Sequence, residues 1–126
     1  MNERKFKMTK EDIRKQLYHL IGKEVMVYID RPVNSVHPRH IEMIYKVNYG
    51  YIKEIIALDN AYQDAYLLGI DYPVDQYQGT VYAVVEREDD IEDKLIVVAN
   101  NDQYTIEELE EKIFFQEQYF KYKIFK

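Results

Sequence analysis

Short segments in which apolar and polar residues alternate fill most of the chain between residues 23 and 99. An alternation with a period of two is typical of strands that bury one face. Turn-forming stretches separate several of these segments, at Asp59 to Gln63, Asp71 to Gly79 and Asp89 to Glu92. The predicted strands cover residues 23–30, 41–47, 51–57, 64–70, 79–88 and 93–99. Six short strands with tight connections favour a small barrel.

Helical patterns flank the strand region on both sides. Thr9 is followed by acidic residues, as at a helix N-cap, and apolar residues then recur at helical spacing until Gly22 ends the helix. Thr105 and Glu108 form a capping box that begins a second helix, over residues 105–118. The aromatic and basic tail, 119–126, is predicted to pack back as an extended segment. The predicted fold class is therefore α+β, a small, mostly antiparallel β-barrel with N- and C-terminal helices.

The composition excludes several classes of protein. The chain has no cysteine, so it forms neither a disulfide framework nor a thiolate metal site. Its net charge of −6 and its scattered basic residues disfavour nucleic-acid binding. No apolar run approaches the roughly 18 to 20 residues that span a bilayer, and the first ten residues are charged, unlike a signal peptide. No linker-like run divides the chain. We therefore expect one cytoplasmic domain, residues 1–126, that binds neither nucleic acid nor membrane.

Carboxylates are concentrated in the turn before the last predicted strand. The segment from Glu86 to Asp93 carries six of them in eight residues. Two like charges about 4 Å apart repel by about 4 kcal/mol at an effective dielectric constant near 20, so such a cluster needs cations or water between its members. Two interpretations remain open at this point, a metal site and a solvated hairpin tip.

A second pair of carboxylates, Asp59 and Asp64, flanks a turn between two apolar strands. If one residue ends its strand and the other opens the next, both face the same mouth of a barrel. Such hard oxygen ligands suit Mg²⁺ or Mn²⁺, bound through carboxylates and substrate phosphates. The alternative is a turn in which Asp59 bonds its own backbone. Lys94 follows Glu92 by two positions, so the two side chains share one face of a strand. Either Glu92 holds a metal while Lys94 meets the anion, or the two residues form a surface ion pair.

Two further groups of polar residues lie near predicted strands. Gly50 stands between two tyrosines in the segment 48–52, where a glycine indicates a bulge or a close backbone approach. The neighbouring tyrosines are either core rings or donors to a phosphate. His37, Arg39 and His40 lie in the loop after the first strand, as phosphate contacts or as ordinary loop residues.

Taken in order, these segments resemble the soluble, metal-dependent family I inorganic pyrophosphatases, especially their short bacterial forms. The resemblance extends over residues 25–119, and its strongest element is V-N-Y-G-Y-I at 47–52. The other elements follow in sequence: Asp59, D-A-Y-L-L-G from Asp64, P-V at 73–74, G-T-V-Y-A-V-V at 79–85, the acidic turn, D-K-L-I-V-V-A at 93–99, and F-F ahead of Tyr119. The resemblance implies the OB-like barrel of the pyrophosphatase fold.

The resemblance also implies a site that cleaves inorganic diphosphate with Mg²⁺, or with Mn²⁺ as the alternative. It assigns catalytic roles to Asp59, Asp64 and Lys94. The implied metal ligands are Asp59, Asp64, Asp89 and Glu92, with Asp90 and Asp93 as rivals for the last two places. The implied substrate contacts are Tyr49, Arg39, Lys94 and Tyr119. Asp30 takes the place of a further family carboxylate near the site.

Two positions depart from the family pattern. Ala61 stands where the family has a third aspartate, which is associated with activating water, and Phe120 replaces a lysine that follows the terminal tyrosine. The leading hypothesis is metal-dependent hydrolysis of diphosphate to two orthophosphates. The alternatives are a weak or inactive module that binds a phosphorylated ligand or a protein partner, hydrolysis of a related anhydride such as a nucleotide, and a purely structural module. The family often assembles, so a homo-oligomer is a further expectation left open.

Overall fold

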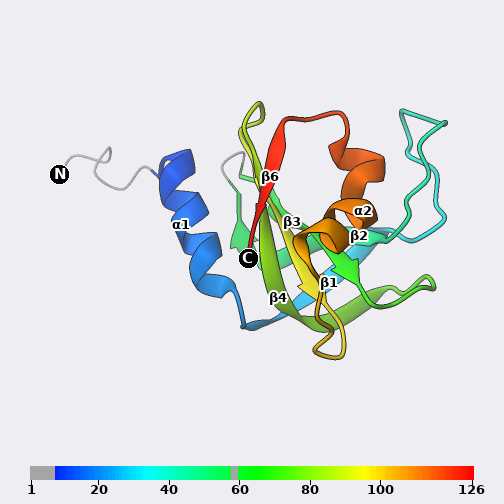
Figure 1. The fold of residues 1–126 in the computed structure, drawn as a ribbon, viewed down its shortest axis with the longest axis horizontal. Coiled ribbons are helices and arrows are strands. Elements are labelled where there is room, and N and C mark those ends of the chain that lie inside the picture. Colours follow the sequence, from blue (N-terminus) through cyan, green and yellow to red (C-terminus); the bar gives the residue numbers. More distant parts are fainter. Residues whose placement is uncertain (1–7, 58–59) are drawn as a thin grey trace.

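The computed structural model describes residues 8–57 and 60–126 (Figure 1). Its elements, in chain order, are α1 (Lys10–Leu20), β1 (Glu24–Arg31), β2 (Asn48–Ile56), β3 (Tyr62–Leu68), β4 (Gln76–Arg87), β5 (Lys94–Val98), α2 (Ile106–Glu117) and β6 (Tyr122–Phe125). The two helices lie on opposite sides of the strands (Figure 1). No helix within these ranges is long and apolar enough to cross a bilayer.

Five of the strands close into a barrel. Their order is β1-β2-β3-β5-β4, and β4 pairs again with β1. The β3–β5 pair is parallel, whereas the other pairs are antiparallel. The end of β4 also pairs with β6, so the C-terminal tail adds a strand to the sheet. The predicted fold class and the predicted extended tail are confirmed.

Both helices begin at the predicted caps. Thr9 accepts a hydrogen bond from the Asp12 backbone N–H, and the Asp12 carboxylate accepts one in return from the Thr9 backbone N–H. Thr105 and Glu108 form the same reciprocal arrangement at α2. Each box satisfies two of the N–H groups that a helix start leaves without partners.

Two groups of buried residues form the core. The first draws on all five barrel strands and on Leu17 of α1, and its strand members are Val27, Ile52, Ala65, Leu67, Val81, Val84, Leu95 and Val97. The second lies between the barrel and α2 and includes Tyr49, Tyr66, Leu68, Ala83, Val85, Ile96, Val98, Leu109 and Ile113. Since β5 contributes to both groups alternately, its sequence from Leu95 to Val98 is a continuous apolar run.

The predicted strand at 41–47 is wrong. This segment is part of a loop that folds back on residues 34–37, with a single bridge between Val36 and Ile44. The Tyr45 N–H donates to Ser35 O, and the Asn34 N–H donates to Tyr45 O. Met43, Tyr45 and Val47 do alternate into the core beneath α2. The alternation therefore reports burial on one side rather than pairing in a sheet.

Gly50 marks a close approach of two backbones, as predicted. A Cβ at this position would lie 1.8 Å from the Tyr28 carbonyl oxygen of β1. The pairing of β1 with β2 shifts register between Ile29 and Arg31 at the same place. No side chain larger than hydrogen fits between these strands.

Candidate functional site

Lys94 is the centre of the candidate site. Because β3 and β5 are parallel and pair Ala65 with Leu95, the preceding residues Asp64 and Lys94 lie side by side at the same end of the two strands. The Lys94 Nζ donates a hydrogen bond of 2.8 Å to Asp64 Oδ2 and lies 3.7 Å from Glu92 Oε1. Lys94 is 8% exposed in its side chain, Glu92 9% and Asp64 35%. One ammonium therefore serves two carboxylates, one of them open to solvent.

Tyr49 and Asp30 lie next to this group. Burial raises the pKa of Tyr49 well above its usual range, and the Asp64 charge acts in the same direction. The Tyr49 hydroxyl is therefore a permanent donor at neutral pH. Burial also raises the pKa of the Asp30 carboxyl, Arg31 opposes this shift, and the Asp64 charge adds to it. Asp30 is thus a third carboxylate, and its pKa responds to the charge of Asp64.

The carboxylates supply the oxygen ligands that a hard divalent cation prefers. Within residues 8–57 and 60–126, no group of three or more Asp, Glu or His side chains is arranged to hold a metal. Mg²⁺ is commonly held by one or two carboxylates together with the phosphates of its substrate. Asp64 and Glu92 supply two such carboxylates around one positive charge. Asp59, which the sequence predicts as a ligand together with Asp64, lies outside the described residues.

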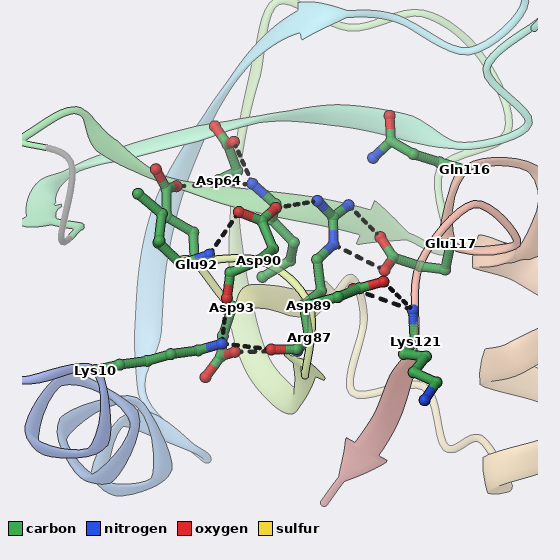
Figure 2. A network of polar contacts seen from close by, with 12 residues as sticks. Lys10, Asp64, Arg87, Asp89, Asp90, Glu92, Asp93, Gln116, Glu117 and Lys121 are labelled. Carbon is green, nitrogen blue, oxygen red and sulfur yellow. Dashed lines mark hydrogen bonds and ion pairs between the residues drawn. The ribbon is translucent and has the colours of Figure 1, made fainter.

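Three other acids of the turn, Asp89, Asp90 and Asp93, are engaged by the protein's own donors (Figure 2). Asp89 accepts from the Lys121 backbone N–H at 3.1 and 3.2 Å, on the side of the turn away from Asp64 and Glu92. Asp90 accepts from Arg87 Nη1 at 2.9 Å. Asp93 accepts from Arg14 Nε and Nη2 at 2.6 and 2.8 Å. Lys10 of α1 donates to the backbone carbonyls of Arg87 and Asp90. The turn is therefore fastened on both sides and not a loosely solvated tip.

A cavity of about 400 Å³ opens beside Tyr49. Its walls come from the loop between β1 and β2, from β2, from the end of β4 and from the end of α2 and the residues after it. The lining residues are His37, His40, Glu42, Met43, Tyr49, Arg87, Gln116, Tyr119 and Phe120. Two predicted phosphate contacts, Tyr49 and Tyr119, thus line one cavity.

Comparison with known proteins bears on the fold. No family model matches the sequence, and no curated protein matches it. Among solved structures, inorganic pyrophosphatase from Ehrlichia chaffeensis superposes with a TM-score of 0.65 at 18% identity, covering 82% of this chain and 86% of that one. The chain has the inorganic pyrophosphatase fold.

Two further structures agree with this pyrophosphatase fold. The enzyme from Coxiella burnetii superposes with a TM-score of 0.56 at 16% identity, over 82% of this chain and 84% of that one. The enzyme from Helicobacter pylori gives 0.55 at 16% identity, over 84% and 85%. The resemblance of the sequence to these proteins therefore extends to the arrangement of the strands.

In this pyrophosphatase fold, the predicted site residues are distributed unevenly. Asp64, Glu92 and Lys94 come together, with Tyr49 next to Asp64. Tyr119 lies across the cavity and is 62% exposed. Arg39 is exposed in the loop before β2, where its backbone N–H donates to His37 Nδ1. Asp89 is held by Lys121 instead of by the Lys94 group.

Arg87 and Glu117 are the main site residues that sequence reasoning missed. Arg87 Nε and Nη2 donate to the Glu117 carboxylate at 3.0 and 2.6 Å, and both side chains are almost inaccessible. The Phe120 ring covers the guanidinium at 3.7 Å. The Tyr66 hydroxyl donates to the same carboxylate. The helical spacing contains a signal, because Glu117 follows Ile113 by four residues and thus falls on the buried face of α2.

Proposed function

We propose that this chain is a metal-dependent hydrolase that converts inorganic diphosphate to two orthophosphates. The observation that carries the proposal is the convergence of Asp64 and Glu92 on Lys94 at one end of a pyrophosphatase-fold barrel. This group lies next to Tyr49, which also lines the neighbouring cavity. The proteins of similar fold from Ehrlichia, Coxiella and Helicobacter are named inorganic pyrophosphatases.

Asp64 and Glu92 would hold Mg²⁺, with Mn²⁺ as the alternative. Asp59 and Asp89 remain predicted further ligands, and Asp89 would have to exchange its bond to Lys121 for such a role. When bound, the cation would offset phosphate charge and make a water molecule more acidic. The exposed edge of Asp64 leaves the pair accessible from solvent.

The donors of the site would bind the phosphate oxygens. Lys94 carries a nearly buried ammonium, whose attraction for an anion is stronger than it would be in bulk water. Tyr49 keeps its proton at neutral pH because burial raises its pKa, so its hydroxyl donates. Tyr119 would approach from the cavity, and Arg39, exposed in the loop before β2, remains a predicted contact. Together these donors would stabilise the charge that the leaving phosphate acquires.

The proposed reaction uses water as the nucleophile. The water oxygen bonds to one phosphorus, the bond from that phosphorus to the bridging oxygen breaks, and the second phosphate leaves with the bridging oxygen. One proton of the water must pass to a base. Ala61 has no titratable group, whereas Asp30 is an exposed carboxylate whose pKa is raised by partial burial and by the charge of Asp64. Asp30 is therefore the proposed acceptor of that proton.

Phosphate release from diphosphate tests this proposal. Wild-type chain, Asp64→Asn and Asp75→Asn are assayed with Mg²⁺ and with Mn²⁺. Asp75 is an exposed aspartate ahead of β4 and provides a matched control for the change of side chain. We expect Asp64→Asn to lower kcat by roughly 10²-fold or more, the usual effect of removing one group that stabilises transition-state charge. Equal rates for wild type and Asp64→Asn would remove the hydrolase proposal.

A binding module without catalysis is the second candidate. It is favoured by Ala61 and by the lack, in the described part of the chain, of three acidic or histidine side chains arranged around a metal. In that case diphosphate would raise the melting temperature of the wild type while no orthophosphate was released. The two candidates are thus separated by one binding measurement and one assay.

A further inference from the structure

The cavity next to Tyr49 has more room than diphosphate alone requires. Its volume of about 400 Å³ lies in the range of roughly 300 to 1,000 Å³ that holds ligands as large as cofactors and drugs. Rings form much of its lining, from His37, Tyr49, Tyr119 and Phe120. Tyr119 is 62% exposed, so its ring has a face that a ligand can cover.

Arg87 is the arginine among the described lining residues of the cavity, and the protein's own groups engage it. Arg87 uses Nε and Nη2 on Glu117 and Nη1 on Asp90, and its face lies against Phe120. The pKa of His37 is lowered by partial burial and by the charges of His40, Arg31 and Arg39, which disfavour its protonated form. The lining also contains Glu42, whose carboxylate lies 3.9 Å from His40 Nδ1. The rings of the lining suit the planar ring of a base.

Tyr49 joins the cavity to the carboxylate site. Its ring lines the cavity and packs on Tyr66 and Tyr45. The charge of Asp64 acts directly on its hydroxyl. A phosphoanhydride bound at Lys94 and Asp64 would therefore have the cavity open to whatever group its far phosphate carries.

We propose that this site accepts, besides inorganic diphosphate, a nucleoside diphosphate, with its base among the rings of the cavity and its anhydride at Lys94. The hydrolytic part rests on the proposed function above. Water adds to the terminal phosphorus, the bond from that phosphorus to the bridging oxygen breaks, and the products are a nucleoside monophosphate and orthophosphate. Binding of the base does not depend on turnover.

Calorimetry with the full chain and Mg²⁺ tests the proposal with two ligands that share the diphosphate ester. ADP carries the ring, whereas methyl diphosphate does not. Stacking of a base on an aromatic side chain predicts that ADP binds at least about fivefold more tightly. The ratio of the two Kd values should fall toward one in Tyr119→Ala and be kept in Tyr119→Phe, which retains the ring. Tyr72→Ala, at an exposed tyrosine outside the cavity lining, should leave the ratio unchanged.

The outcomes separate this inference from the hydrolase proposal. Equal affinities for ADP and methyl diphosphate, or a ratio that Tyr119→Ala does not change, overturn the nucleotide site. Preferential binding of ADP, with no orthophosphate released from either ADP or inorganic diphosphate, supports the base site and removes the hydrolase. Hydrolysis of inorganic diphosphate that ADP does not inhibit supports the hydrolase and overturns the nucleotide site.

Discussion

Two clusters of charge meet at the acidic turn, and they contain the same number of charges. Arg87 faces Glu117 and Asp90, and Lys94 faces Asp64 and Glu92. Around Arg87, three separate nitrogens each donate to a carboxylate at 3.0 Å or less. Around Lys94, a single nitrogen makes one hydrogen bond and one longer ion pair. One cluster is thus a closed structural unit, whereas the other keeps one carboxylate, Asp64, partly exposed and is the proposed cation site.

The difference follows from the cation and from burial. A guanidinium offers donors in a fixed fork that matches carboxylates, whereas an ammonium is a compact point charge on a flexible stem. Glu117 is completely buried, and Asp64 is 35% exposed. The Arg87 cluster should therefore dominate stability, and the Lys94 cluster should dominate ligand binding.

The largest expected effect on stability comes from Glu117→Gln. The change leaves Arg87 buried with Asp90 as its remaining carboxylate partner, and removal of one member of a buried ion pair typically costs 3 to 5 kcal/mol. Because Asp90 remains, we expect a loss of about 3 kcal/mol in the free energy of unfolding. Urea denaturation measures it.

A double variant supplies the control for this prediction. Arg87→Met combined with Glu117→Gln removes both charges, so its loss should be smaller than the sum of the two single losses. A Glu117→Gln protein as stable as the wild type would show that the pair is not structural.

A smaller loss is expected from Arg14→Ala. Arg14 of α1 donates two hydrogen bonds to Asp93, whose side chain is only 3% exposed. The variant leaves a buried carboxylate without its charged partner, which should cost about 2 kcal/mol. Lys15→Ala is the matched control on the same helix, because Lys15 and Glu11 form an exposed pair at 3.9 Å and such pairs contribute roughly 0 to 1 kcal/mol. Equal urea midpoints for the two variants would contradict a role of α1 in holding the turn.

Much of the fold follows from the sequence because the signals are local. The N-cap at Thr9, the capping box at Thr105 and the need for glycine at position 50 depend on neighbouring residues or on one strand pair, and all three are confirmed. The strand predicted at 41–47 is wrong because burial on one side produces the same alternation in a loop as in a strand.

The candidate site was less accessible to sequence reasoning. Asp64 and Lys94 are 30 residues apart, and they meet only because β3 and β5 pair in parallel. Asp89 and Glu92 are close in sequence, yet the turn directs one to Lys121 and the other to Lys94. The partners of Arg87 come from α2 and from the turn, so its burial depends on tertiary packing and not on local composition.

Asp64→Asn in the Lys94 cluster should reduce stability much less than Glu117→Gln does in the Arg87 cluster. Since Asp64 is partly exposed and Lys94 keeps Glu92, we expect a loss below about 1 kcal/mol in urea. Magnesium should raise the melting temperature of the wild type, because a ligand bound only by the folded state stabilises it. The rise should be absent or reduced in Asp64→Asn and kept in Asp75→Asn. An equal rise in all three proteins would place magnesium elsewhere.

The smallest expected effect is a pH dependence on the structural side of the turn. Burial, together with the hydrogen bond that Tyr18 donates to Glu86, raises the pKa of Tyr18 from 10.0 to about 12. Between these values the unfolded chain loses a proton that the folded chain keeps, so the stability linked to Tyr18 is fully present below pH 10 and is lost as the pH rises toward 12. Tyr18→Phe should therefore lose less stability than the wild type over this interval, when urea midpoints are compared at each pH. Parallel curves for the two proteins would mean that burial and the hydrogen bond to Glu86 do not raise the pKa of Tyr18, and would contradict this contact between α1 and the acidic segment.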